Sequence, residues 1–238
     1  MDGQSSFIDT IGHGTHVGGI TGAHSNNGIG VAGMNWDGQL MAIRVCKAIP
    51  YFPYNTCDPT GMVQGISYAV ANGAKVINLS LGSGTPCSSS PVQQDTINSA
   101  ISRGAVIVAA AGNNGVNAAQ FSPASCTGLI TVGALDQSNA RSLWPGGQSS
   151  NYGARIDIAA PGSAILSTYK EGGYESSNGT SQAAPFVSGA AALLLSVNPS
   201  LKPQQVKDCI INSGDPITTD LPLGGRKLNV LRMLQQCG

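Results

Sequence analysis

Charged residues are scarce in this chain of 238 residues, and their scarcity argues against several classes of partner. Asp, Glu, Lys and Arg together make up 10% of the sequence, and twelve basic residues balance twelve acidic ones. A nucleic-acid binder needs a basic surface, and a protein held at a membrane by charge needs a polybasic patch. We therefore expect neither nucleic acid nor a membrane as a partner.

Long apolar runs are also missing. The longest nearly apolar run, Ala183 to Val197, is interrupted by a proline, a serine and a glycine, and it is too short to span a bilayer. The first seven residues, MDGQSSF, have no basic region and no apolar core, so they are not a signal peptide. If the protein is exported, its targeting segment lies outside this chain.

The six cysteines contain no CxxC pair, and the chain has only three histidines. A zinc site is therefore poorly supported. An even number of cysteines favours disulfides formed in an oxidising compartment over buried free thiols. Six cysteines allow fifteen pairings, so the residues alone leave the connectivity open.

Short apolar runs alternate with helical patterns along the chain. Strands are predicted at 39–45, 75–81, 105–111, 129–135 (with Leu129 to Val132 as the core of that run) and 155–160. The runs lack a clean alternation of polar and apolar residues, as expected for strands that are covered on both faces. Apolar residues at helical spacing predict helices at 61–74 and 91–105, each ending near a glycine, Gly73 or Gly104.

This order of elements predicts the fold class. Strand, helix and strand in succession imply right-handed crossovers and a mainly parallel central sheet with helices on both faces, a three-layer α/β fold. Residues 1–238 read as a single domain, with no repeat and no linker. The Pro-rich and aromatic segment 48–61 reads as a surface excursion bracketed by Cys46 and Cys57.

Three polar motifs interrupt this apolar framework. GHGTH contains His13, AAAGNNG places Asn113 at the end of an apolar run, and NGTSQAAP places Ser181 just before a helix of small residues. Each has an ordinary explanation: a structural histidine, an Asn-Gly turn, and a serine that caps a helix, with Pro185 in its first turn. His16 and His24 keep the structural interpretation.

The three motifs in this order resemble those of the subtilisin-like serine proteases, and the later half of the chain is most similar to the proteinase K group. The resemblance extends from Asp9 to the segment KLNVLRML near the C-terminus. It implies a subtilisin-like fold and an acyl-transfer mechanism. His13 would be the general base, Ser181 the nucleophile and Asn113 the side-chain donor to the oxyanion.

The resemblance also implies a substrate cleft for a peptide or protein. The stretch LSLGSG (79–84) would pair with an extended peptide. Ser80, Leu81 and Gly82 would face Ala110, Ala111 and Gly112 across the pocket for the residue before the scissile bond. These walls are small and largely apolar, which suggests tolerance of apolar or aromatic side chains.

The family's triad aspartate is not visible in this sequence. It ends the first strand of the family, well before the histidine, but only twelve residues precede His13. Asp9 is too close to His13 and Asp2 has no strand before it, so the third member is unassigned. We therefore expect an N-terminally truncated domain that lacks the usual first strands, with a propeptide or a complementing N-terminal segment as a candidate partner.

The resemblance further suggests that Cys87 pairs with Cys126, which leaves Cys46 with Cys57 and Cys209 with Cys237 as local choices. It also suggests a structural calcium site, although the chemistry itself requires no cofactor. The calcium ligands would be two backbone carbonyls, of Thr127 and Leu129, and the carboxylate of Asp157. A capping role for Asp157 is the alternative.

The sequence thus predicts a secreted serine endopeptidase. The alternative is a catalytically silent remnant that binds peptides without cleaving them. A nucleotide-binding α/β domain is excluded by the lack of a GxGxxG motif or P-loop after a strand.

Overall fold

The computed structural model describes residues 8–48 and 55–238. Within them lie the helices α1 (His13–Gly22), α2 (Pro59–Ala71), α3 (Pro91–Ser102), α4 (Thr180–Val197), α5 (Pro203–Ser213) and α6 (Val230–Cys237). The central sheet contains β3 (Val76–Leu79), β4 (Val106–Ala110), β5 (Ile130–Leu135), β8 (Ile158–Pro161), β11 (Asp215–Pro216) and β12 (Arg226–Lys227). Three small hairpins complete the fold, namely β1 (Cys46–Ala48) with β2 (Asn55–Cys57), β6 (Leu143–Trp144) with β7 (Gln148–Ser149), and β9 (Ile165–Thr168) with β10 (Tyr174–Ser177).

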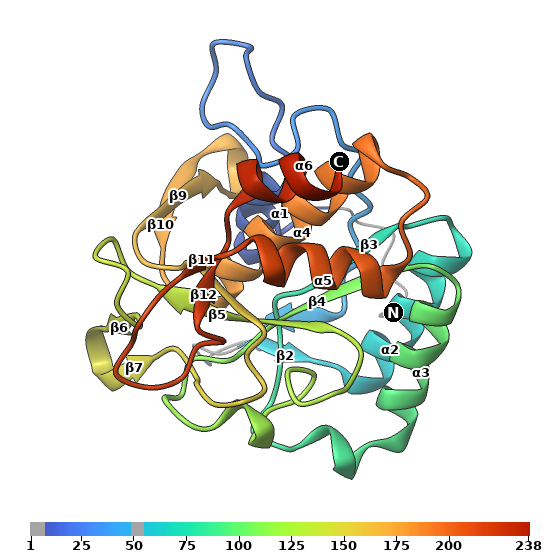
Figure 1. The fold of residues 1–238 in the computed structure, drawn as a ribbon, viewed down its shortest axis with the longest axis vertical. Coiled ribbons are helices and arrows are strands. Elements are labelled where there is room, and N and C mark those ends of the chain that lie inside the picture. The colour runs from blue at the N-terminus through green and yellow to red at the C-terminus, as the bar shows by residue number, and fades with distance from the viewer. Residues whose placement is uncertain (1–7, 49–54) are drawn as a thin grey trace.

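The strands of the central sheet lie in the order β11-β12-β8-β5-β4-β3. All neighbours are parallel except β11 and β12, which are antiparallel. Helices α2 and α3 cover one face, and α4, α5 and α6 cover the other (Figure 1). The predicted three-layer, mainly parallel α/β architecture is confirmed.

Strand β4 shows why the apolar runs do not alternate. Val106 and Val108 pack with α4, whereas Ile107 packs with α2 and α3 on the opposite face. All five residues of β4 are buried. A strand between two helical layers must be apolar on both sides, because neither side meets water.

Helix α4 forms the centre of the larger cluster. It is the one helix of the described residues that is long and apolar enough to cross a membrane by length and composition, but 61% of it is buried inside the protein. Its small residues let it approach the sheet closely: Ala183, Ala184, Ala190 and Ala191 are fully buried. The helix therefore packs as a core helix of the domain.

Four of the five predicted strands form as β3, β4, β5 and β8, and both predicted helices form as α2 and α3. The glycines predicted to end these helices are confirmed, since Gly73 and Gly104 have φ of 85° and 93° just after α2 and α3. Without a Cβ, glycine adopts this left-handed conformation at little cost.

The strand predicted at 39–45 is wrong. These residues pair with no strand among those described, and the first strand, β1, starts only at Cys46. Ile43 and Val45 instead pack beside Gly65 of α2. An apolar run becomes a strand only when a partner satisfies its backbone groups, and the sequence carries no sign of that partner.

Part of the segment 48–61, residues 49–54, lies outside the described residues, as does Asp2. The described remainder of this segment is more regular than the predicted excursion, because Asn55–Cys57 forms β2 and Pro59 begins α2.

Three disulfides join all six cysteines. They link Cys46 with Cys57, Cys87 with Cys126, and Cys209 with Cys237. The pairing implied by the resemblance is confirmed.

Candidate active site

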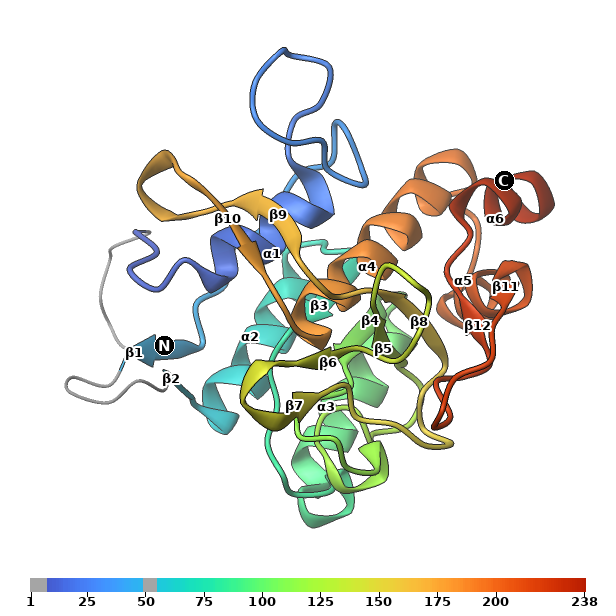
Figure 2. The ribbon, with the colours of Figure 1, turned by 90° about the vertical axis from the view of Figure 1, so that its left-hand side faces the viewer.

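Two of the three motifs meet where β3 and β4 end and α4 begins, and the third begins the helix that packs against α4. Ser80 follows β3 and Gly112 and Asn113 follow β4, so parallel pairing places them at the same edge of the sheet. Ser181 is the second residue of α4, and His13 is the first residue of α1, which packs against α4 (Figure 2). In open α/β sheets, ligand sites form at this edge, beyond the carboxyl ends of the strands.

The Asn113 amide is oriented by Thr180. The backbone N–H and the hydroxyl of Thr180 both donate to Asn113 Oδ1, at 2.9 and 2.8 Å. The same hydroxyl accepts the N–H of Gly112 at 3.0 Å, and Thr180 is 1% exposed. Because Oδ1 is occupied by two donors, the Nδ2 group is the part of Asn113 that remains to donate to another acceptor beside Ser181.

Ser181 does not cap α4, because the N-cap is Gly179. Among the described residues, its Oγ makes one long hydrogen bond, 3.4 Å, to the carbonyl oxygen of Ser80. Pro185 lies in the second turn of α4 rather than the first, and it has no N–H to donate to the carbonyl of Ser181. The hydroxyl of Ser80 donates to that carbonyl instead, at 2.8 Å, and so fixes the start of α4 to the end of β3.

His13 begins α1 after Gly12, whose φ of 91° suits glycine. A Cβ at Gly12 would also lie 2.4 Å from the ring of Tyr169. Among the described residues, the His13 ring makes no hydrogen bond, either to Ser181 or to another residue. The imidazole is exposed, yet nearby protein displaces part of its water, and this desolvation is the main cause that lowers its pKa. His16 lowers that pKa further, and Asp9 opposes the shift.

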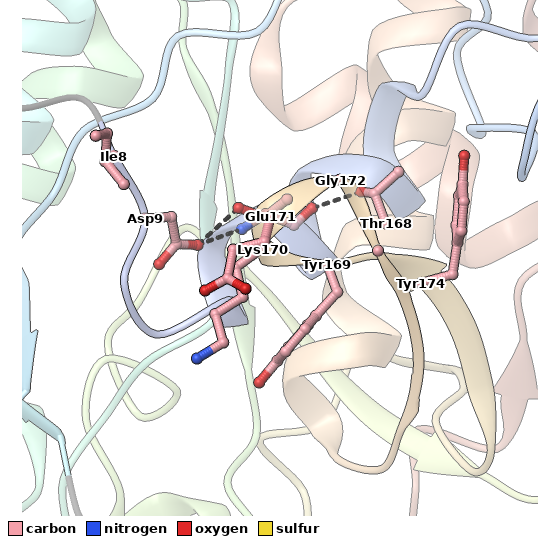
Figure 3. A pocket seen from close by; sticks show the side chains of 10 residues that line it. Ile8, Asp9, Thr168, Tyr169, Lys170, Glu171, Gly172 and Tyr174 are labelled. Atoms are coloured by element: carbon pink, nitrogen blue, oxygen red, sulfur yellow. Dashed lines mark hydrogen bonds between the residues drawn. The ribbon is translucent and has the colours of Figure 1, made fainter.

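Asp9 holds the loop before α1. Its carboxylate accepts hydrogen bonds from the N–H groups of Ile11, Gly12 and Thr15 and from the Thr15 hydroxyl, at 2.7 to 2.9 Å. These bonds outweigh the effect of burial and lower the pKa of Asp9. Figure 3 shows Asp9 at the edge of a pocket of about 440 Å³ whose opposite wall is the turn between β9 and β10. Neither Ser181 nor Asn113 lines this pocket, so Asp9 acts as a loop cap and not as the missing triad member.

The structural interpretation of His16 is confirmed. The residue is 1% exposed, and its Nε2 lies 3.0 Å from the carbonyl oxygens of both Ile165 and Glu175 in the β9–β10 hairpin. The hydroxyl of Ser167 donates back to the carbonyl of His16 at 2.8 Å. The hairpin therefore holds α1 in place (Figure 2). His24 is exposed in the loop after α1.

The predicted pocket walls are arranged differently from the expectation. Ala110 and Ala111 are 4% and 0% exposed, so their side chains lie in the core and offer little surface to a ligand. A Cβ on either Gly82 or Gly112 would lie within 3 Å of the ring of Phe121. The ring of Phe121 thus lies against both glycines.

The three oxygens predicted to bind calcium already have protein partners. Gln94 Nε2 donates to the carbonyl of Thr127 at 3.2 Å. Lys207 Nζ donates to the carbonyl of Leu129 at 2.7 Å and forms an ion pair with Asp157 Oδ1 at 2.9 Å. The described residues also hold no group of three or more His, Cys, Asp or Glu side chains suited to a metal. This arrangement does not fit a calcium site.

Sequence reasoning missed three residues that matter here. Thr180 is adjacent to Ser181 in the motif NGTS, but its hydrogen-bond partners, Gly112 and Asn113, lie far away in the sequence. Phe121 and Lys207 act on residues that are distant in the sequence, so no local pattern could reveal them.

Comparisons with known proteins agree with this geometry. Residues 2–238 match the sequence pattern of the Subtilase family. The chain is 42% identical to Subtilisin Savinase of Lederbergia lenta over 213 residues, which cover 90% of this chain and 74% of that protein. It is also 42% identical to an alkaline protease of Alkalihalobacillus alcalophilus, of which it spans only 52%.

Solved structures give the same result. The fold is similar to a protease structure from Pseudoalteromonas arctica PAMC 21717, with a TM-score of 0.86 and 31% sequence identity over 95% of this chain and 71% of that one. Sequence and fold together show that this chain belongs to the subtilase family of serine proteases.

Proposed function

We propose that this chain is a serine endopeptidase in which Ser181 is the nucleophile and His13 the general base. Ser181 Oγ attacks the peptide carbonyl while His13 takes the hydroxyl proton, which it then gives to the leaving amine. Asn113 Nδ2 and the N–H of Ser181, in the first turn of α4, donate to the oxyanion. The observation that carries the proposal is the Asn113 amide, which Thr180 orients beside Ser181.

The substrate is a peptide or protein that lies along the 79–84 segment. Ser80, Leu81, Gly82 and Gly112 form its walls, with Ala110 and Ala111 behind them and the Phe121 ring against the two glycines. Because the Phe121 ring takes up space there, we expect small or flat apolar side chains before the scissile bond. Replacing Phe121 with Ala would shift the preference of the enzyme towards larger side chains.

His13 needs a carboxylate to orient it, and none of the described residues supplies one. The outer edge of β3 supports a strand as the source, since among the described residues β3 pairs only with β4. In the segment before β1, Leu40 and Met41 are exposed apolar side chains, 54% and 43%. We propose that an extended segment with an acidic residue at its end, such as a complementing N-terminal segment, pairs along this edge.

We place the protein outside the cell, because three disulfides persist in an oxidising compartment. No cofactor takes part in the proposed chemistry, and calcium bound by Thr127, Leu129 and Asp157 is not part of the proposal.

Hydrolysis of a chromogenic peptide anilide with an apolar residue before the scissile bond tests this function. We expect turnover that is lost in Ser181→Ala and unchanged in Ser99→Ala, which removes the hydroxyl of an exposed serine in α3, outside the proposed catalytic and substrate-binding residues. If the folded chain binds the peptide without turnover, with or without an added complementing segment, the peptide-binding alternative is correct.

A further inference from the structure

The ion pair of Lys207 and Asp157 lies at the edge of the sheet opposite the candidate active site. Leu129 and Asp157 each directly precede a strand, β5 and β8, whereas Ser80 and Asn113 follow strands. Lys207 extends to them from the middle of α5. One side chain therefore links a helix of the outer layer to the first residues of two neighbouring strands.

The Lys207 ammonium lies between a carbonyl oxygen and a carboxylate oxygen. The distances from Nζ are 2.7 Å to the oxygen of Leu129 and 2.9 Å to Oδ1 of Asp157. The other oxygen of Asp157, Oδ2, accepts the N–H of Thr131 at 2.8 Å, which holds the carboxylate in this orientation. The lysine and aspartate side chains are only 17% and 23% exposed, so water screens the pair less than it screens a surface pair.

The carbonyl oxygen of Thr127 is the third oxygen expected to bind a metal. The backbone of Thr127 forms two hydrogen bonds with the side-chain amide of Gln94. Gln94 Nε2 donates to this oxygen, and the N–H of Thr127 donates to Gln94 Oε1 at 2.8 Å. A divalent ion would have to displace this amide and also share the Asp157 carboxylate with a fixed ammonium. Repulsion between the two cations at such short range disfavours that arrangement.

We propose that the ammonium of Lys207 is the structural cation at this position. It neutralises Asp157, satisfies the carbonyl of Leu129 and joins α5 to β5 and β8, so a divalent ion is excluded as long as the ammonium is present. Removal of the ammonium should leave the two oxygens free to bind an inorganic cation.

Calcium stoichiometry, measured by titration calorimetry on the whole chain, tests the proposal even if calcium binds elsewhere. We expect Asp157→Asn to bind the same number of calcium ions as the wild type. Lys207→Ser should bind one more, and the double variant Lys207→Ser with Asp157→Asn should lose that extra ion. Lys75→Ser, which removes an exposed lysine before β3 at the same edge of the sheet, is the control and should leave the stoichiometry unchanged.

Thermal unfolding gives a second readout. With a chelator present, Lys207→Ser should melt roughly 4–10 °C below the wild type, and calcium should recover part of that loss. Lys207→Gln retains most of the side-chain length without the charge, and it replaces Lys207→Ser if that variant does not fold. The proposal is overturned if the wild type binds an ion that Asp157→Asn removes, or if neither Lys207 variant gains one.

Discussion

The protonation of His13 controls the proposed reaction, because only the neutral imidazole accepts the proton of Ser181. Desolvation by the surrounding protein lowers the pKa of His13 below 6.5, so the neutral form persists to lower pH than in a free histidine. The rate of reaction with a fluorophosphonate should therefore rise with pH and reach half its maximum below pH 6.5. A midpoint above 6.5 would show that a carboxylate beside His13 outweighs desolvation.

The same shift has a consequence for stability. The unfolded chain binds a proton at His13 more readily than the folded chain does, so this residue makes folding less favourable as pH falls below 6.5. The contribution of His13 to the free energy of unfolding should thus become more favourable as the pH rises towards 6.5. His13→Ala should reduce this pH dependence, as measured by urea unfolding at several pH values.

The proposed role of Asn113 as a donor to the oxyanion can be tested by removing its side-chain amide. Loss of one oxyanion donor in subtilisin, a member of the same family, lowers kcat about 10²–10³-fold. We expect Asn113→Ala to lower kcat for a peptide anilide by a similar factor with little change in KM. Asn114→Ala removes the adjacent, exposed amide and should have no such effect. Equal losses in the two variants would argue against the assigned role.

Among the elements, the contact between α1 and α4 is the one that sets His13 relative to Ser181. At Gly189 of α4, a Cβ would lie 2.5 Å from Met34 Cβ and 2.9 Å from the carbonyl oxygen of Thr21 in α1. Gly189→Ala should therefore push the two helices apart, destabilise the fold by about 1–3 kcal/mol and slow the labelling of Ser181. A Cβ at Gly84 would meet no atom within 4 Å, so Gly84→Ala is the control for stability and should leave the free energy of unfolding nearly unchanged. Labelling at the wild-type rate in Gly189→Ala would contradict this account.

The elements also show how far the sequence can predict this fold. Strand β4 and helices α2 and α3 were predictable because apolar spacing and the terminal glycines, Gly73 and Gly104, are local signals. Residues 39–45 have the same apolar character but no strand partner among the described residues, and pairing is not encoded locally. In the same way, His13, Asn113 and Ser181 could be found from short motifs, whereas the contacts of Lys207 depend on the folded chain.

For the whole molecule, the disulfides are a stabilising framework whose contributions should differ with loop size. The bond from Cys209 to Cys237 closes 28 residues and ties α5 to α6, whereas that from Cys46 to Cys57 closes 11. Loop-closure entropy predicts that replacing the first pair with serines costs about 3.6 kcal/mol and the second about 2.8 kcal/mol. Urea unfolding of the two double variants measures both, and the opposite order would contradict the entropic explanation.

The central claim is that His13 and Ser181, carried by different helices, form one nucleophilic group in the folded molecule. Labelling with a fluorophosphonate, with mass spectrometry to locate the modified residue, tests this claim most directly. We predict that Ser181 is labelled, that Ser181→Ala is not, and that His13→Ala is labelled far more slowly than the wild type. Unchanged labelling of Ser181 in His13→Ala, or no labelling of the folded wild-type chain, would contradict the account.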